Sequence, residues 1–169
     1  MRLLIIGAGP GGYETAVEAA KRGMEVTLIS EGPLGGTCLN EGCIPTKTMC
    51  HYAELIEQNI KAGMNCRPSV VTMVEHRQAV MEQLRRGVEM MLKGVQVVQG
   101  RAQFKDAKTV VCNGQEFTAD KIIIATGSVS ASLPIPGAEN CITSKEILEL
   151  NRVPESLCVI GGGVIGQEF

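Results

Sequence analysis

The sequence lacks tryptophan, and aromatic residues make up only 3% of its 169 residues. Neither sign of charge dominates, because the formal net charge at pH 7 is −2, so nothing indicates a nucleic-acid surface. No apolar run has the length of a membrane-spanning helix. The short apolar start at residues 2–6 also lacks the features of a signal peptide. We therefore expect a cytoplasmic protein without a nucleic-acid or membrane partner.

Ligands for a metal ion are scarce as well. The two histidines, His51 and His76, are isolated, and no second pair of cysteines or histidines has zinc-ligand spacing. We therefore expect no metal site. Without a secretion signal, the seven cysteines indicate a reducing compartment. Most of them are expected to act as small apolar residues: Cys50, Cys66, Cys112, Cys141 and Cys158.

The chain does contain many apolar residues, 44% of the total, and 20 glycines. Residues 3–6 and 24–30 have the short apolar pattern of buried strands, and residues 11–22 have the spacing of a helix that ends at Gly23. A strand, a glycine turn, a helix and a second strand in this order begin a doubly wound α/β fold with a mostly parallel sheet.

Further along the chain, long helices give way to short strands. Helices are expected over residues 43–62 and 69–92, the second with an apolar, methionine-rich face that fills the core. The next strands predict a small antiparallel meander, followed by a strongly apolar strand, a short helix and a last buried strand. The predicted ranges are 95–99, 101–104, 108–112, 115–118, 121–126, 144–150 and 157–160.

The turn after the first strand has the spacing G-x-G-x-x-G at Gly7, Gly9 and Gly12. In dinucleotide-binding folds, the first glycine permits the turn, the second lets a pyrophosphate approach, and the third lets helix and strand pack closely. The N-terminus of the helix then faces the phosphates. Glu31 ends the second strand, where an acid binds the adenosine ribose. The motif predicts a site for FAD or NAD, and a purely structural glycine turn is the alternative.

Cys38 and Cys43 stand five positions apart, beyond the second strand and at the start of a predicted helix. Such a spacing alone decides nothing in a chain with this many cysteines. The position is more informative, because the positive end of a helix favours the thiolate that takes part in thiol–disulfide exchange. The pair is therefore a candidate redox-active site.

Four segments together are similar to one known family: GAGPGGYETA at 7–16, GGTCLNEGCIPTK at 35–47, ATGS at 125–128 and GGGVIGQE at 161–168. The second closely resembles the redox-active disulfide of the pyridine nucleotide–disulfide oxidoreductases, and most of all that of the dihydrolipoamide dehydrogenase branch. The resemblance covers the whole chain. It implies an FAD-dependent dithiol/disulfide oxidoreductase with a Rossmann-like FAD domain, which oxidises dihydrolipoyl groups with NAD as the final acceptor.

The resemblance implies a role for each matching residue. Cys38 would be the interchange thiol, and Cys43 would lie against the flavin as the charge-transfer thiolate. Lys47 would lie near flavin N5 and Glu168 would pair with it, whereas ordinary surface charges are the alternative for both. FAD would contact Gly7, Gly9, Gly12, Glu31, Gly36, Thr37, Ala102, Thr126, Gly127 and Ser128, and the NAD motif would begin with Gly161, Gly163 and Gly166.

Two residues depart from the commonest pattern of the family. Glu41 stands where a small apolar residue is frequent, and Thr46 stands where serine is frequent. Because a carboxylate disfavours a nearby thiolate, we expect Glu41 to favour re-formation of the disulfide.

The resemblance also implies an FAD-binding domain at residues 1–150 and the start of an NAD-binding domain at 151–169, truncated before the rest of that domain and the interface domain of the family's homodimers. We therefore expect these residues alone to retain FAD weakly and to produce no NADH. Two alternatives stay open. One is a family member similar to glutathione or mercuric reductase, and the other is a non-catalytic FAD- or nucleotide-binding module.

Overall fold

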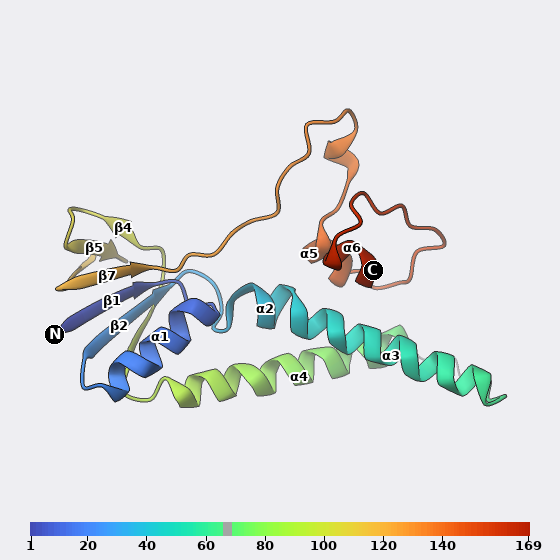
Figure 1. Cartoon of the computed structure of the whole chain (residues 1–169), viewed down its shortest axis with the longest axis horizontal. Coiled ribbons are helices and arrows are strands. Elements are labelled where there is room, and N and C mark those ends of the chain that lie inside the picture. Colours follow the sequence, from blue (N-terminus) through green and yellow to red (C-terminus); the bar gives the residue numbers. More distant parts are fainter. Residues whose placement is uncertain (66–68) are drawn as a thin grey trace. The chain divides into compact units, whose positions relative to one another are not determined.

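The computed structural model describes residues 1–65 and 69–169, and the prediction for Cys66 falls outside them. These residues form two compact units (Figure 1). The first unit contains Met1–Asn40 and Gln83–Val129, and the second contains Glu41–Glu82 and Ser130–Phe169. Each unit is described by itself below.

A four-stranded parallel sheet with the order β3–β2–β1–β7 forms the centre of the first unit (Figure 1). Helix α1 (Pro10–Lys21) connects β1 to β2, so the chain begins with the predicted strand–helix–strand unit. The chain then adds β3 beyond β2 and returns to place β7 on the other side of β1. The predicted doubly wound α/β fold is therefore confirmed. The strands are β1 (Arg2–Ile6), β2 (Glu25–Ser30), β3 (Gln96–Gln99) and β7 (Lys121–Ile124).

The hydrophobic core of the first unit lies between this sheet and a small antiparallel sheet of three strands. These strands are β4 (Gln103–Phe104), β5 (Thr109–Cys112) and β6 (Gln115–Thr118). Because side chains alternate along a strand, β1 also presents apolar residues to its opposite face, where α1 contacts β1 and β2. The residues buried between the two sheets are Leu4, Ile6, Ile29, Val110, Cys112, Phe117 and Ala119.

Strand β3 corrects one prediction. The sequence places residues 95–99 in the meander, but β3 pairs in parallel with β2, with Val97 beside Leu28. β3 follows the long helix α4 (Val70–Met91). A strand that follows a helical crossover joins a sheet in parallel, and its local residue pattern does not reveal which sheet it joins.

Helices dominate the second unit. It contains α3 (Cys43–Lys61), α5 (Ser144–Leu148) and the first part of α4, and all three helices lie close to their predicted ranges. The rings of Tyr52 in α3 and His76 in α4 meet edge to face, with 5.4 Å between their centroids. Arg77 of α4 is buried and donates a hydrogen bond to the backbone carbonyl of Leu148 at the end of α5.

Several predicted core positions are wrong. Residues 157–160 are exposed and form no strand, because no other strand lies among the described residues of the second unit to supply backbone partners. Cys141 and Cys158 are exposed and do not fill a core. On α4, Val88 is buried but Met91 is exposed, so the predicted apolar face is only partly covered.

Three short helices are missing from the sequence prediction. Each has six residues or fewer, and a helical period is hard to recognise over so few positions. They are α2 (Gly36–Glu41), the 3₁₀ helix η1 (Ala138–Asn140) and α6 (Val164–Glu168). Over the described parts of the chain, no helix has both the length and the apolar character needed to cross a membrane.

The glycines at the start of α1 provide a test of the packing in the first unit. A Cβ atom at Gly12 would overlap the carbonyl oxygen of Gly7, whereas a Cβ atom at Gly11 would meet nothing within 4 Å. We expect Gly12→Ala to lower the free energy of unfolding by ~2 kcal/mol through overpacking. Gly11→Ala should leave it unchanged or raise it by up to ~1 kcal/mol. Thermal or urea unfolding checks this, and equal effects at both positions would contradict the close approach.

Candidate functional site

The turn between β1 and α1 is held by backbone contacts that require glycine. Gly7 adopts φ +104° and its N–H donates to the carbonyl of Ile29 at 2.7 Å. A Cβ atom on Gly7 would overlap the carbonyl oxygen of Ala125, which follows β7. Gly12 packs against Gly7 in the same way. The first and third glycines of the motif therefore allow α1 to pack directly against the ends of β1 and β7.

The N-terminus of α1 is open to a ligand. Gly9 is its N-cap and provides no side-chain cap, and Pro10 follows at the first helical position. The first N–H groups of a helix have no partner within the helix, and together with the helix dipole they attract phosphate. Gly36, with φ +60°, approaches this end so closely that a Cβ atom on it would lie 2.5 Å from Gly9 Cα. We call Gly7, Gly9, Gly12 and Gly36 the glycine cradle.

The other predicted dinucleotide residues of the first unit follow the carboxyl ends of the parallel strands. Glu31 is exposed directly after β2, and the carbonyl of Glu31 accepts a hydrogen bond from Gln99 Nε2 at 2.7 Å. The segment Thr126–Gly127–Ser128 is exposed just beyond β7. Strand order reverses between β1 and β7, and open parallel sheets bind ligands at such a reversal. The fold thus gathers these residues at one edge of the sheet.

Ala102 follows the carboxyl end of β3 by three residues and packs against the core between the two sheets. The preceding bend is fixed by Gly100, whose N–H donates to the carbonyl of Ser30 at 2.8 Å. A Cβ atom on Gly100 would lie 2.6 Å from Cys112 Sγ. Because its methyl group is packed into the core, Ala102 has its backbone as the group to offer a ligand.

Cys38 lies in α2, directly after the glycine cradle. Its side chain is half-buried, and Thr37 beside it is exposed. Burial, together with the negative charges of Glu14 and Cys38, raises the pKa of Tyr13 in α1. Tyr13 therefore lies close enough to Cys38 for their charges to interact. The sequence prediction did not include Tyr13 in the site.

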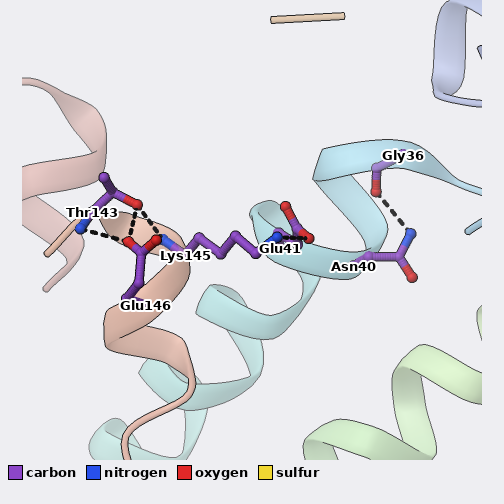
Figure 2. Close-up of polar contacts among 6 residues, drawn as sticks. All are labelled: Gly36, Asn40, Glu41, Thr143, Lys145 and Glu146. Carbon is purple, nitrogen blue, oxygen red and sulfur yellow. Dashed lines mark hydrogen bonds and ion pairs between the residues drawn. The ribbon is translucent and has the colours of Figure 1, made fainter. Parts of the chain in front are cut away.

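Asn40 is a second residue that the sequence prediction missed. Its amide donates to the carbonyl oxygens of Gly36 at 2.8 Å and Leu34 at 3.0 Å, and so closes α2 onto the preceding turn (Figure 2 shows the bond to Gly36). Asn40 Oδ1 is buried, with no hydrogen-bond partner in the described structure. The position of Asn40 between the two cysteines was the signal available in the sequence.

Cys43 is an exposed thiol at the first position of α3, after the N-cap Gly42. One helical turn later, Lys47 forms the expected ion pair with Glu168 of α6. The hydrogen bond to Glu168 raises the pKa of Lys47, and negative charge on Cys43 and Cys50 acts in the same direction. A protonated lysine and the positive end of α3 therefore place positive charge within one helical turn of Cys43.

The second glycine motif repeats one contact of the first. Gly161 has φ +117°, and a Cβ atom on Gly166 would overlap the carbonyl oxygen of Gly161, as Gly12 would overlap Gly7. Gly163 is the N-cap of α6 and provides no side-chain cap. The described residues contain no group of three histidine, cysteine or acidic side chains that could hold a metal ion.

Comparison with known proteins places these features in one family. The family described as "Pyridine nucleotide-disulphide oxidoreductase" matches residues 1–169. Dihydrolipoyl dehydrogenase of Geobacillus stearothermophilus is 44% identical over 98% of this chain and 38% of its own length. Dihydrolipoyl dehydrogenase of Acholeplasma laidlawii is 38% identical over 99% of this chain and 54% of its own length.

A solved structure supports the same relationship. The HOCl-induced flavoprotein disulfide reductase RclA from Escherichia coli superposes with a TM-score of 0.85 at 33% identity, covering 99% of this chain and 38% of its own. The chain thus spans between 38 and 54% of the length of these relatives. The match over all 169 residues shows that the chain belongs to the pyridine nucleotide-disulphide oxidoreductase family.

Proposed function

We propose that this chain provides the FAD-binding, disulfide-bearing part of an enzyme that oxidises dihydrolipoyl groups, with NAD as the final acceptor. The observation that carries the proposal is the place of Cys38, two residues after Gly36, whose Cα approaches Gly9 at the N-terminus of α1. A thiol that follows the glycine cradle by two residues supports the proposal. Relatives named dihydrolipoyl dehydrogenase support the substrate class. A cytoplasmic location and a homodimer belong to the same proposal.

The first unit fits FAD in three ways. The glycine cradle leaves no side chain between a pyrophosphate and the N–H groups of α1. Exposed Glu31 would accept hydrogen bonds from the adenosine ribose. Thr37 and the segment 126–128 are exposed for further contacts, and Ala102 has its backbone available for the adenine. When bound, FAD supplies an acceptor for two electrons and a donor of hydride to nicotinamide.

The cysteine pair would perform thiol–disulfide exchange. One thiol of a dihydrolipoyl group attacks Cys38 in a Cys38–Cys43 disulfide, forms a mixed disulfide and releases Cys43 as a thiolate. The second substrate thiol attacks the mixed disulfide, closes the substrate disulfide and releases Cys38. The substrate loses two electrons and two protons: the cysteine pair gains both electrons, Cys38 leaves as a thiol with one proton, and the second proton goes to solvent while Cys43 stays a thiolate. Lys47 and the N-terminus of α3 place positive charge close in sequence to the sulfur that leaves from Cys43.

Residues 161–168 support the place of NAD in the proposal. Gly161, Gly163 and Gly166 form a turn and a helix N-terminus of the same kind as the glycine cradle. We propose that residues 1–150 belong to the FAD domain and that residues 151–169 begin the NAD domain. One other function is favoured by a specific observation, namely the likeness to a flavoprotein disulfide reductase. In that case the cysteine pair would reduce a different disulfide.

The cofactor proposal predicts that the acidic residues at the two ends of β2 differ in their effect on FAD affinity. We expect Glu31→Gln to weaken the binding of added FAD about tenfold, because it removes a charged hydrogen-bond acceptor worth ~1.5 kcal/mol. Glu25, exposed at the other end of β2, is the control, and Glu25→Gln should leave the affinity unchanged. Titration of FAD followed by its fluorescence measures both variants. Equal affinities for Glu31→Gln and the parent chain would contradict the assignment.

The disulfide proposal predicts a single pairing among the cysteines. Oxidation with glutathione disulfide should join Cys38 to Cys43 and leave Cys50 and Cys141 as thiols. Peptide mapping by mass spectrometry detects the linked peptide, which Cys43→Ser should abolish and Cys141→Ser should preserve. A bond between Cys43 and Cys50 in the oxidised chain would argue against the proposed pair.

The chain covers only part of the length of its relatives, and this leads to a further prediction. The relatives extend well beyond the matched region, so the 169 residues alone should form no NADH from dihydrolipoamide and NAD⁺. The assay follows absorbance at ~340 nm with added FAD. A steady rate above that of a Cys38→Ser control would refute this expectation.

A further inference from the structure

Glu41, the acid that departs from the family pattern, is paired with a lysine from a distant part of the sequence. Lys145 Nζ of α5 lies 2.6 Å from Glu41 Oε1 (Figure 2). Glu41 ends α2 and precedes Cys43 by two residues, so the two Cα atoms are at most about 7 Å apart. The hydrogen bond to Glu41 raises the pKa of Lys145, so the lysine stays protonated at neutral pH. The carboxylate that stands two residues before Cys43 is therefore matched by a positive charge.

The short helix that carries Lys145 is fixed at both ends. At its start, Thr143 and Glu146 form a capping box, in which the Thr143 N–H donates to Glu146 Oε2 at 2.7 Å (Figure 2). At its end, the carbonyl of buried Leu148 accepts a hydrogen bond from the buried guanidinium of Arg77. Lys145 is thus presented to Glu41 by an anchored helix, although its own side chain is 50% exposed.

Cys43 has an ion-paired residue on each side of it in the sequence, an acid before it and a lysine after it. Before it, negative Glu41 is paired with Lys145, and after it, positive Lys47 is paired with Glu168. Both partners come from residues 130–169, and the thiol of Cys50 also lies near Lys47. Removal of Lys145 would leave Glu41 as an uncompensated negative charge beside Cys43. Such a charge disfavours a thiolate and therefore the reduced form of the cysteine pair.

We propose that Lys145 is a positioning residue for the redox site, which acts through Glu41 by neutralising its carboxylate and so keeps the Cys38–Cys43 pair reducible in a chain with an acid between its cysteines. This inference rests on the proposed function. It also changes what the sequence alone implies about Glu41, because the carboxylate is not isolated. An exposed ion pair contributes little to stability, so the effect of Lys145 belongs to the redox equilibrium and not to folding.

The test equilibrates the full chain with reduced and oxidised dithiothreitol, which exchanges two electrons with the Cys38–Cys43 pair. Alkylation and mass spectrometry measure the oxidised fraction. Lys145→Gln should shift the equilibrium threefold to tenfold towards the disulfide, which corresponds to about 14–30 mV. In a Glu41→Gln background, the same change should shift it less than twofold, because the carboxylate to be neutralised is gone. Lys145→Arg should restore the parent value.

Lys61→Gln is the matched control. Lys61 forms an ion pair with Glu57 at 2.6 Å on α3 itself, at the end distant in sequence from Cys43, and its removal should not move the equilibrium. Unfolding midpoints equal to that of the parent would show that Lys145→Gln retains the fold. An unchanged equilibrium for Lys145→Gln, or an equal shift with and without Glu41, would overturn the inference.

A second readout separates this inference from the proposed function. If the parent chain forms no Cys38–Cys43 disulfide, the proposed function fails. The role of Lys145 is then tested on the reduced chain by the reactivity of Cys43. There, Lys145→Gln should slow the alkylation of Cys43 by iodoacetamide at neutral pH threefold to tenfold, because the thiolate reacts. An unchanged rate would overturn the role of Lys145. If the disulfide forms but none of the variants shifts it, only the inference fails.

Discussion

The close approach of backbone to backbone at the carboxyl end of β1 is the constraint on which the rest of the first unit depends. At Gly7, Gly12 and Gly36, an added Cβ atom would overlap the backbone of another segment of the same chain. These contacts bring the N-terminus of α1, the end of β7 and the start of α2 together in one small region. The same absence of side chains exposes the helix N–H groups to a phosphate. Packing and the proposed binding of FAD therefore depend on the same glycines, and the thiol of Cys38 follows in the adjoining helix.

Charge around the second cysteine is arranged differently, by ion pairs that join the end of α2 and the first turns of α3 to later segments of the chain. Lys47 and Glu168 form one pair, and Glu41 and Lys145 form the other. Each pair places one charged residue close in sequence to Cys43 and draws its partner from α5 or α6. Because exposed pairs add little stability, the role proposed for them is to balance charge near a thiol whose chemistry depends on its ionisation. Both partners, Lys145 and Glu168, follow Cys43 by about 100 positions or more.

Much of the first unit could be predicted from the sequence, because its signals are local. The apolar runs of β1 and β2 and the glycines between them specify a strand, a turn and a helix within about 30 residues. Other elements depend on partners that local patterns do not name. Residues 96–99 resemble the meander strands but pair with β2, whereas residues 157–160 have a strand-like composition and no partner strand among the described residues. The short helix α2 was hidden for another reason, because its start looks like a glycine loop.

The sequence by itself determined the order of elements in the first half of the parallel sheet, the glycine turns and the family to which the chain belongs. These features rest on backbone geometry that only certain residues permit, and on spacings that are visible along the chain. The tertiary structure alone decided which strands became neighbours, that Asn40 closes α2, and that Glu41 meets Lys145. Such contacts join side chains far apart in the sequence, and no sequence motif names their partners, unlike the Lys47–Glu168 pair that the family resemblance implied.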